Sequence, residues 1–163
     1  MKFEPSTIEL LDTAEFTLST DVDLPASIDE VWAVIADNTS WTDWFHNCNK
    51  VIAPEDTWTE AGQLRTISST PFVIEEVALV VDEPNRWAIS LLNSNLPMAK
   101  AMVEVLDLND TSRNGETRTQ VKWTAAIDLY PWMKPTRPIA ERLLVRTWGN
   151  SLEALQNAVL ARR

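Results

Sequence analysis

The segment from Pro138 to Ala161, PIAERLLVRTWGNSLEALQNAVLA, decides the fold of this 163-residue chain. Its apolar residues return every three or four positions and no proline follows the first residue, so it predicts one helix of roughly 24 residues. At 1.5 Å per residue this helix is about 36 Å long, enough to span a whole small domain. Proline is tolerated in the first turn of a helix, which agrees with a start at Pro138.

A strand and two short helices are expected near the start of the chain. Residues 15–24 alternate between apolar and polar side chains, which predicts a half-buried strand. Ser27 and Glu30 have the spacing of a capping box, so the first short helix is expected to begin there. Residues 38–47 predict the second short helix, because three aromatic residues recur in them at helical spacing: Trp41, Trp44 and Phe45.

The middle of the chain has the pattern of an antiparallel meander. Turn residues separate about six strand-like segments, which cover residues 51–53, 63–69, 72–81, 86–92, 99–108 and 119–129. Together with the first strand and the long helix, this order predicts an α+β fold. The length fits one domain, which we expect at residues 15–163 after an N-terminal extension at residues 1–14.

Charge and hydropathy exclude several classes of partner. The chain has 14 Lys and Arg against 24 Asp and Glu, a formal net charge of −10. This balance and the lack of a basic stripe argue against nucleic acid or an anionic membrane surface, which are bound mainly through clustered basic residues. The longest apolar run, Val31 to Ala36, is far shorter than the roughly 20 residues that cross a bilayer, so membrane insertion is not expected. No leader-like apolar segment precedes Glu15, which favours the cytoplasm.

The reactive residues are too few for most cofactor motifs. A single cysteine, Cys48, and a single histidine, His46, exclude an internal disulfide, a multi-cysteine zinc site and a two-histidine metalloprotease motif. The three glycines lie too far apart for a phosphate-binding loop. We therefore expect no metal or cofactor. The composition is instead unusual in its eight tryptophans, which provide a large, rigid aromatic surface.

The predicted order of elements resembles the START-like superfamily, also called SRPBCC or the polyketide cyclase/dehydrase and lipid transport superfamily, which shares the fold of the birch-pollen allergen. The resemblance covers residues 15–160. The residues that carry it are Leu24-Pro25-Ala26-Ser27 before Val31-Trp32, Trp41 with Trp44, Gly62 with Arg65, Glu75-Glu76-Val77, Pro84 with Arg86-Trp87, and Gly115-Glu116-Thr117 before Val121 and Trp123. Related sequences often have Gly-Gly-Thr at the last of these turns, so the geometry of that loop is expected to differ.

The resemblance implies a helix-grip fold and an internal cavity. A curved antiparallel sheet of about six or seven strands would wrap around the long C-terminal helix, with two short helices after the first strand. A hydrophobic small molecule would lie between sheet and helix. An empty cavity of ~300 Å³ costs on the order of 7 kcal/mol, so the walls must be stiff, and buried tryptophans could provide them. The alternative is that the eight tryptophans fill a solid core.

Six residues are candidates for the cavity lining, and two for its mouth. Trp87, Ile89, Trp123 and Ile127 lie on the apolar faces of two predicted strands, and Leu143 and Thr147 lie one turn apart on the long helix. If the sheet curves around that helix, these side chains face one interior; otherwise they belong to the ordinary core. Trp44 and Phe45 fall where the resemblance implies the cavity mouth, and the alternative is simple packing of a short helix.

Two charged residues lie on strand faces that are otherwise apolar. Arg65 shares a face with Ile67, and Glu75 interrupts the series Val73, Val77, Leu79. If both point inward, Arg65 can anchor a polar group of the ligand and Glu75 can pair with it. The alternative places them on the solvated face or in a purely structural ion pair.

No catalytic residue is assigned from the sequence. His46 is the natural general base if chemistry occurs, but it has no partner acid that the sequence reveals. Cys48 is expected to be a small apolar filler. No spacing argument distinguishes Tyr130, Asp128 or Glu104.

These observations favour a non-catalytic protein that binds or carries a hydrophobic or amphipathic molecule, such as a lipid, isoprenoid or polyketide. The first alternative is an enzyme of the polyketide cyclase or dehydratase type, which would need several ionisable groups converging in the cavity. The second is a protein-interaction or regulatory module, which would show a large exposed apolar patch. A homodimer is compatible with exposed tryptophans.

Overall fold

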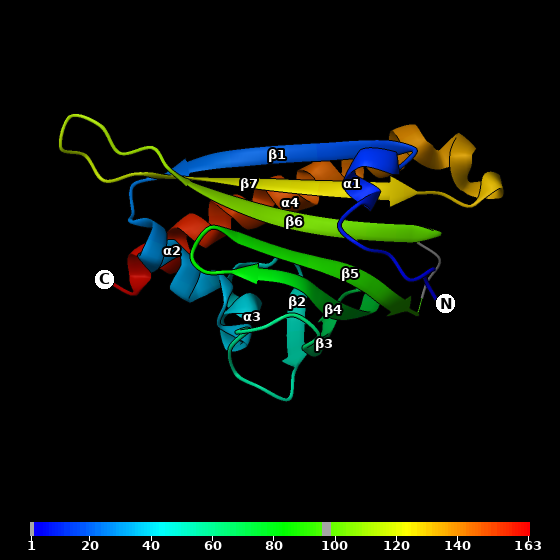
Figure 1. Ribbon diagram of the computed structural model, residues 1–163, viewed down its shortest axis with the longest axis horizontal. Helices are drawn as coiled ribbons and strands as arrows, with labels where there is room; N and C mark the ends of the chain where they lie inside the picture. The colour runs from blue at the N-terminus through cyan, green and yellow to red at the C-terminus, as the bar shows by residue number, and fades with distance from the viewer. Residues whose placement is uncertain (1, 96–98) are drawn as a thin grey trace.

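The computed structural model describes residues 2–95 and 99–163, and these form a seven-stranded antiparallel sheet with helices (Figure 1). The strand order across the sheet is β1-β7-β6-β5-β4-β3-β2. The strands are β1 (Phe16–Leu24), β2 (Cys48–Ile52), β3 (Leu64–Ser69), β4 (Phe72–Asp82), β5 (Arg86–Ser94), β6 (Ala101–Asp110) and β7 (Thr119–Asp128). The predicted α+β meander is therefore confirmed.

Six helical segments accompany the sheet in the described residues. They are α1 (Leu10–Thr13), α2 (Ile28–Ile35), η1 (Asn38–Ser40), α3 (Trp41–Trp44), η2 (Pro131–Thr136) and α4 (Arg137–Ala161). The long C-terminal helix predicted from Pro138 is α4, which starts one residue earlier. In residues 2–95 and 99–163, no helix combines the length and the hydropathy that a bilayer crossing requires.

The capping box predicted at the start of α2 is present. The Glu30 backbone N–H donates to Ser27 Oγ at 3.3 Å, and the Ser27 N–H donates to the Glu30 carboxylate at 2.8 Å. The second predicted helix, at residues 38–47, is shorter and divided into η1 and α3. It ends because Phe45 is extended and Asn47 adopts a left-handed φ of 59°, which turns the chain into β2.

The main core lies on the face of the sheet that α2, α3 and α4 cover. In Figure 1, α4 crosses this face behind β1, β7 and β6. Its buried side chains follow one helical stripe, Trp148, Leu152, Leu155 and Val159. They meet inward-facing strand residues such as Trp123 and Leu106.

The opposite face of the sheet carries a second, smaller core that the N-terminal segment covers. Ala88, Val103 and Val105 are buried there beneath Ile8, Leu10 and Leu11. Figure 1 shows α1 in front of β6 and β7, on the side away from α4. The segment expected to be an extension is therefore packed against the domain along part of its length.

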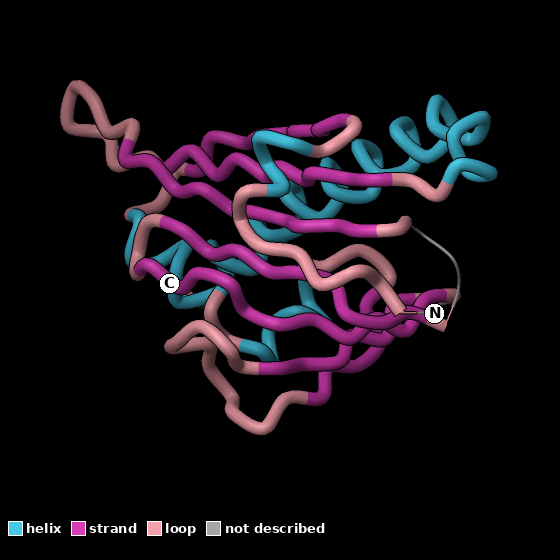
Figure 2. The backbone as a smooth tube through the Cα atoms, turned by 45° about the vertical axis from the view of Figure 1, so that its right-hand side comes forward, coloured by secondary structure: helices cyan, strands magenta, loops and turns pink. Residues whose placement is uncertain are grey.

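Two features mark opposite ends of the sheet. Figures 1 and 2 place the turn between β6 and β7 at one end and η2, with the start of α4, at the other. Figure 2 shows the β6–β7 turn projecting beyond the strands.

Candidate functional site

A cavity of about 270 Å³ lies between the sheet and the first half of α4. The sheet contributes side chains that include Phe16, Ile74, Met102, Glu104 and Ile127, and α4 contributes Ala140, Leu143, Leu144, Thr147 and Trp148. Leu143 is 60% exposed, so the cavity opens to solvent beside it. The lining is mainly apolar, and its polar side chains are those of Ser69, Glu104 and Thr147.

Glu104 is the one ionisable residue in the described lining of the cavity. It occupies an inward-facing position of β6 between Met102 and Leu106, opposite the small side chain of Ala125 on β7. Its Oε2 accepts a hydrogen bond of 2.9 Å from Trp123 Nε1.

Burial raises the pKa of Glu104 to about 8, and the nearby Glu76 carboxylate adds to the rise. The Trp123 N–H and the positive charge of Arg65 oppose this increase without cancelling it. At neutral pH the Glu104 carboxyl is therefore mainly protonated and can donate a hydrogen bond into the cavity. In the sequence, Glu104 is a glutamate within the inward-facing series of an otherwise apolar strand. That signal could have identified it as a site residue, but the sequence analysis did not select it.

Arg65 lies behind the cavity in a cluster of polar and aromatic side chains. Its side chain has no exposed surface, and its Nε donates to Glu76 Oε2 at 2.7 Å. Nη1 donates to Asn38 Oδ1 at 3.2 Å, and Nη2 has no hydrogen-bond partner among the described residues. Burial lowers the pKa of Arg65, and the Glu76 carboxylate opposes the decrease. The guanidinium stays charged, because an arginine is not deprotonated in proteins.

Three indole rings enclose this guanidinium. The distances from its carbon to the ring centroids are 3.7 Å for Trp41, 4.6 Å for Trp58 and 4.9 Å for Trp87. The Trp58 N–H also donates to Asn38 Oδ1. Cation–π attraction and the ion pair together offset the free energy that the guanidinium loses when it is removed from water.

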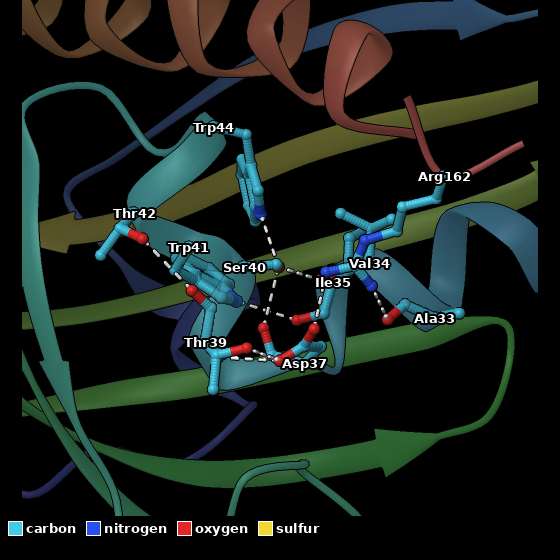
Figure 3. A network of polar contacts seen from close by, with 10 residues as sticks. All are labelled: Ala33, Val34, Ile35, Asp37, Thr39, Ser40, Trp41, Thr42, Trp44 and Arg162. Carbon is cyan, nitrogen blue, oxygen red and sulfur yellow. Dashed lines mark hydrogen bonds and ion pairs between the residues drawn. The ribbon is translucent and has the colours of Figure 1, made fainter. Parts of the chain in front are cut away.

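Hydrogen bonds fix the indoles of α3 in the core (Figure 3). Trp41 Nε1 donates to the Ile35 carbonyl at 2.9 Å, and Trp44 Nε1 donates to Ser40 Oγ at 3.3 Å. Both indoles are 1% exposed. Trp123 stacks on Trp148 with centroids 5.7 Å apart. Most of the tryptophans therefore build a solid core, and a cavity remains beside it.

The residues predicted for the site separate into three groups. Phe45, Ile127, Leu143 and Thr147 line the cavity. Trp44, Arg65, Trp87, Ile89 and Trp123 are buried in the core and do not line the cavity. Glu75 is exposed on the other face of the sheet.

The ion pair considered between Arg65 and Glu75 forms with Glu76 instead. Arg65 lies opposite Glu76 in the β3–β4 register, and the inward series of β4 is Ile74, Glu76 and Ala78. The series that contains Glu75 and Leu79 points outward. It looked like a buried face because the N-terminal segment covers part of that side, where Leu79 packs in the second core.

The backbone of His46 is held by two hydrogen bonds, and Cys48 is buried. The His46 N–H donates to Ser151 Oγ at 3.0 Å, and its carbonyl accepts from Ser69 Oγ at 3.0 Å. Burial raises the pKa of the Cys48 thiol, which keeps it in the unreactive thiol form. In the described part of the chain, no group of three or more His, Cys, Asp and Glu side chains is arranged to hold a metal ion.

The family model described as polyketide cyclase / dehydrase and lipid transport matches residues 15–159. The chain belongs to this family. The resemblance stated from the sequence is therefore confirmed, and the matched region holds both the cavity and the Arg65 cluster. A search of curated proteins found no match.

Solved structures share the fold of this polyketide cyclase/dehydrase and lipid transport family member. The Zhui aromatase/cyclase from Streptomyces sp. R1128 superposes with a TM-score of 0.72 at 19% identity, over 90% of this chain and 94% of that chain. XoxI from Bacillus cereus gives 0.70 at 18% identity, over 88% and 95%. Norcoclaurine synthase from Thalictrum flavum, in complex with dopamine and hydroxybenzaldehyde, gives 0.66 at 14% identity, over 100% and 97%.

Proposed function

We propose that this protein binds a small, mostly apolar molecule in the cavity between the sheet and α4, with an oxygen acceptor of the molecule facing Glu104. The observation that carries the proposal is an apolar cavity lined by a carboxyl whose pKa is raised to about 8. Family membership supports it, because proteins of this family bind hydrophobic ligands or act as cyclases.

The size of the cavity favours a compact ligand. Its volume of about 270 Å³ lies just below the usual range of ligand pockets, about 300–1,000 Å³. An apolar cavity of about 150 Å³ holds one benzene molecule. A molecule of one or two rings therefore fits better than a long acyl chain.

Glu104 determines which polar group the ligand carries. A protonated carboxyl in an apolar cavity offers one O–H donor, and a buried donor without a partner is costly. A ligand carbonyl satisfies this donor, whereas a ligand carboxylate would place a second anionic group near Glu76. We therefore expect aromatic or alicyclic ketones to be preferred over hydrocarbons of the same shape.

The test compares 2-acetylnaphthalene with 2-isopropenylnaphthalene, in which a CH2 group replaces the carbonyl oxygen on the same planar carbon. Binding is measured at pH 6.5 by calorimetry and by quenching of tryptophan emission, since Trp148 lines the cavity. The ketone should bind about 3- to 10-fold more tightly, the contribution of one hydrogen bond. Glu104→Leu should remove this preference, and Glu104→Gln, which keeps an N–H donor, should retain most of it.

Two further variants separate binding in the cavity from binding elsewhere. Thr147→Trp fills the cavity and should abolish binding of both probes, whereas Lys122→Gln on the exposed face of β7 should change nothing. The proposal fails if neither probe binds the wild-type protein, or if Thr147→Trp binds both as well as the wild type does.

A catalytic role of the cyclase or dehydratase type is the second candidate, and the raised pKa of Glu104 is the observation that favours it. A carboxyl that is protonated near neutrality can act as a general acid on a carbonyl. The several converging ionisable groups expected for such an enzyme are absent from the described lining, where Glu104 stands alone. Turnover of a poly-β-ketone that is lost in Glu104→Gln while binding remains would favour this role over carriage.

A further inference from the structure

The three most exposed large apolar side chains of the described residues lie on η2 and α4, which also carry the cavity-lining residues Met133, Ala140 and Leu143. Trp132 on η2 is 62% exposed, and Ile139 and Leu143 on α4 are 64% and 60% exposed. Ile139 and Leu143 are four residues apart, so they lie on the same face of the helix. Leu143 also lines the cavity, and η2 leads directly into α4. Exposed apolar residues are therefore concentrated where a ligand would enter.

The segment formed by η2 and the first half of α4 has a positive net charge, opposite to that of the rest of the protein. Residues 131–149 contain four basic residues, Lys134, Arg137, Arg142 and Arg146, and one acidic residue, Glu141, in a chain of net charge −10. Lys134 pairs with Glu15, and Arg137 pairs with Glu141.

Two of these arginines flank the apolar residues of α4. Arg142 follows Ile139 by three positions and Arg146 follows Leu143 by three, so all four share the outer face of the helix. Arg142 and Arg146 make no hydrogen bond or ion pair with any described residue. Both charges are therefore available to a partner.

We infer that this η2–α4 surface, formed by Trp132, Ile139, Arg142, Leu143 and Arg146, docks on an anionic lipid membrane. Tryptophan prefers the interface between headgroups and acyl chains, and Ile139 and Leu143 can enter the upper acyl region. The arginines attract and hydrogen-bond lipid phosphates. In this docked orientation the cavity mouth is directed toward the membrane. An apolar ligand can then pass between the membrane and the cavity without crossing water.

The net charge of −10 does not prevent this contact. At physiological ionic strength, charges more than about 8 Å apart are largely screened, so residues close to the membrane dominate the interaction. Along the outer face of α4, Glu153 is seven residues beyond Arg146, about 10 Å away at 1.5 Å per residue. An anionic membrane partner was not expected from the sequence, because the total charge is −10 and no basic stripe was recognised; Arg142 and Arg146 are one turn apart on α4 and form a local basic excess that the total charge hides.

This inference goes beyond the proposed function, and it can fail or succeed whether or not the cavity binds a ketone. The experiment is sedimentation of the full chain with vesicles of pure phosphatidylcholine, and with vesicles containing about 30% phosphatidylglycerol to supply the negative surface charge. Binding is expected to the anionic vesicles, to weaken as salt is raised, and to be much weaker to the neutral ones.

Charge-matched variants locate the contact. Arg142→Gln with Arg146→Gln should lower the partition coefficient by about 30-fold, the effect of removing two surface charges. The control variant Arg113→Gln with Lys122→Gln makes the same change in net charge away from this surface. Arg113 lies in the β6–β7 turn at the opposite end of the sheet (Figure 2). This variant should bind the vesicles like the wild type.

A second pair tests the apolar part. Trp132→Ser with Ile139→Ser should also reduce binding, whereas Ile52→Ser with Leu64→Ser, at the β2–β3 side of the sheet, should not. Equal binding to both vesicle types, or equal effects of the members of either matched pair, would overturn the inference. So would binding to polyglutamate or self-association through this surface without vesicle binding, since either would assign the surface to a protein partner.

Discussion

Glu104 and Arg65 show that a charge-bearing side chain acquires its role from its immediate surroundings. Both occupy inward positions of apolar strands, yet Arg65 has a carboxylate partner and three indole faces, whereas Glu104 has one indole N–H. Arg65 therefore remains charged, and Glu104 becomes neutral near pH 7. The first is a structural core residue and the second is the one ionisable group in the described lining of the cavity.

The raised pKa of Glu104 predicts a specific dependence of stability on pH. The folded-state pKa of about 8 lies above the ordinary value of 4.5, so the folded protein holds this proton more tightly than the unfolded chain. The stabilisation is fully present below about pH 4.5 and is lost as pH rises through 8, at up to about 1.4 kcal/mol per pH unit. Glu104→Gln should remove this loss, as measured by urea unfolding between pH 5 and 8.5.

The control for this prediction is Glu75→Gln, which removes an exposed carboxyl from the opposite face of the sheet and should follow the wild-type curve. The comparison between Glu104→Gln and the wild type cancels the contributions of the other titrating groups. Parallel stability curves for these two proteins would contradict the assignment of the raised pKa to Glu104.

At the scale of elements, the segment after α3 is held between α4 and β3. The His46 N–H donates to Ser151 Oγ on α4, and the His46 carbonyl accepts from Ser69 Oγ on β3. Ser151 Oγ in turn donates to the Thr147 carbonyl at 2.9 Å. These bonds hold the segment that includes Phe45, which lines the cavity. The aromatic wall is therefore positioned by hydrogen bonds as well as by packing.

Ser151→Ala should lower the free energy of unfolding by about 1–2 kcal/mol, because the partly buried His46 N–H loses its acceptor. It should also weaken binding of the ketone probe, since Phe45 is less firmly placed. Ser19→Ala, at an exposed position of β1, provides the matched control and should change stability by less than about 0.5 kcal/mol. If the two variants unfold at the same urea concentration, the His46–Ser151 bond does not stabilise the site.

At the scale of the whole molecule, the sheet is covered on both faces. The helices cover the main core, and the N-terminal segment covers the smaller cluster of Ala88, Val103 and Val105. The segment is attached by backbone hydrogen bonds from Phe3 N–H to the Leu92 carbonyl at 3.0 Å and from Glu4 N–H to the Lys100 carbonyl at 2.8 Å. Without it, an apolar strip of the sheet would face water.

Deletion of residues 2–14 should therefore destabilise the domain although it removes no cavity residue. Loss of the buried Phe3 and of the partly buried Ile8, Leu10 and Leu11 should cost at least about 2–4 kcal/mol and lower the Tm by at least about 6–12 °C, measured by calorimetry. Leu10→Ser with Leu11→Ser should reproduce part of the decrease in a chain of full length. An unchanged Tm in both proteins would show that the segment does not stabilise the sheet.

The sequence by itself determined the elements whose signals are local. The periodicity of α4, the capping box of α2 and the alternation of β7 depend on neighbouring residues, and each occurs where it was predicted. Ile127, Leu143 and Thr147 also lie on the faces expected from the period of their own elements, whereas Phe45 follows α3 in an extended conformation and was expected near the cavity only from the resemblance.

Only the tertiary structure decided which residues meet across elements. Strand register paired Arg65 with Glu76, and the N-terminal segment made the outward series of β4 look buried. The raised pKa of Glu104 arises from its burial and from the Glu76 carboxylate on β4, and no spacing along β6 reveals either. Periodicity is a property of one segment, whereas burial and charge pairing depend on residues far apart in the chain, so folding alone determines them.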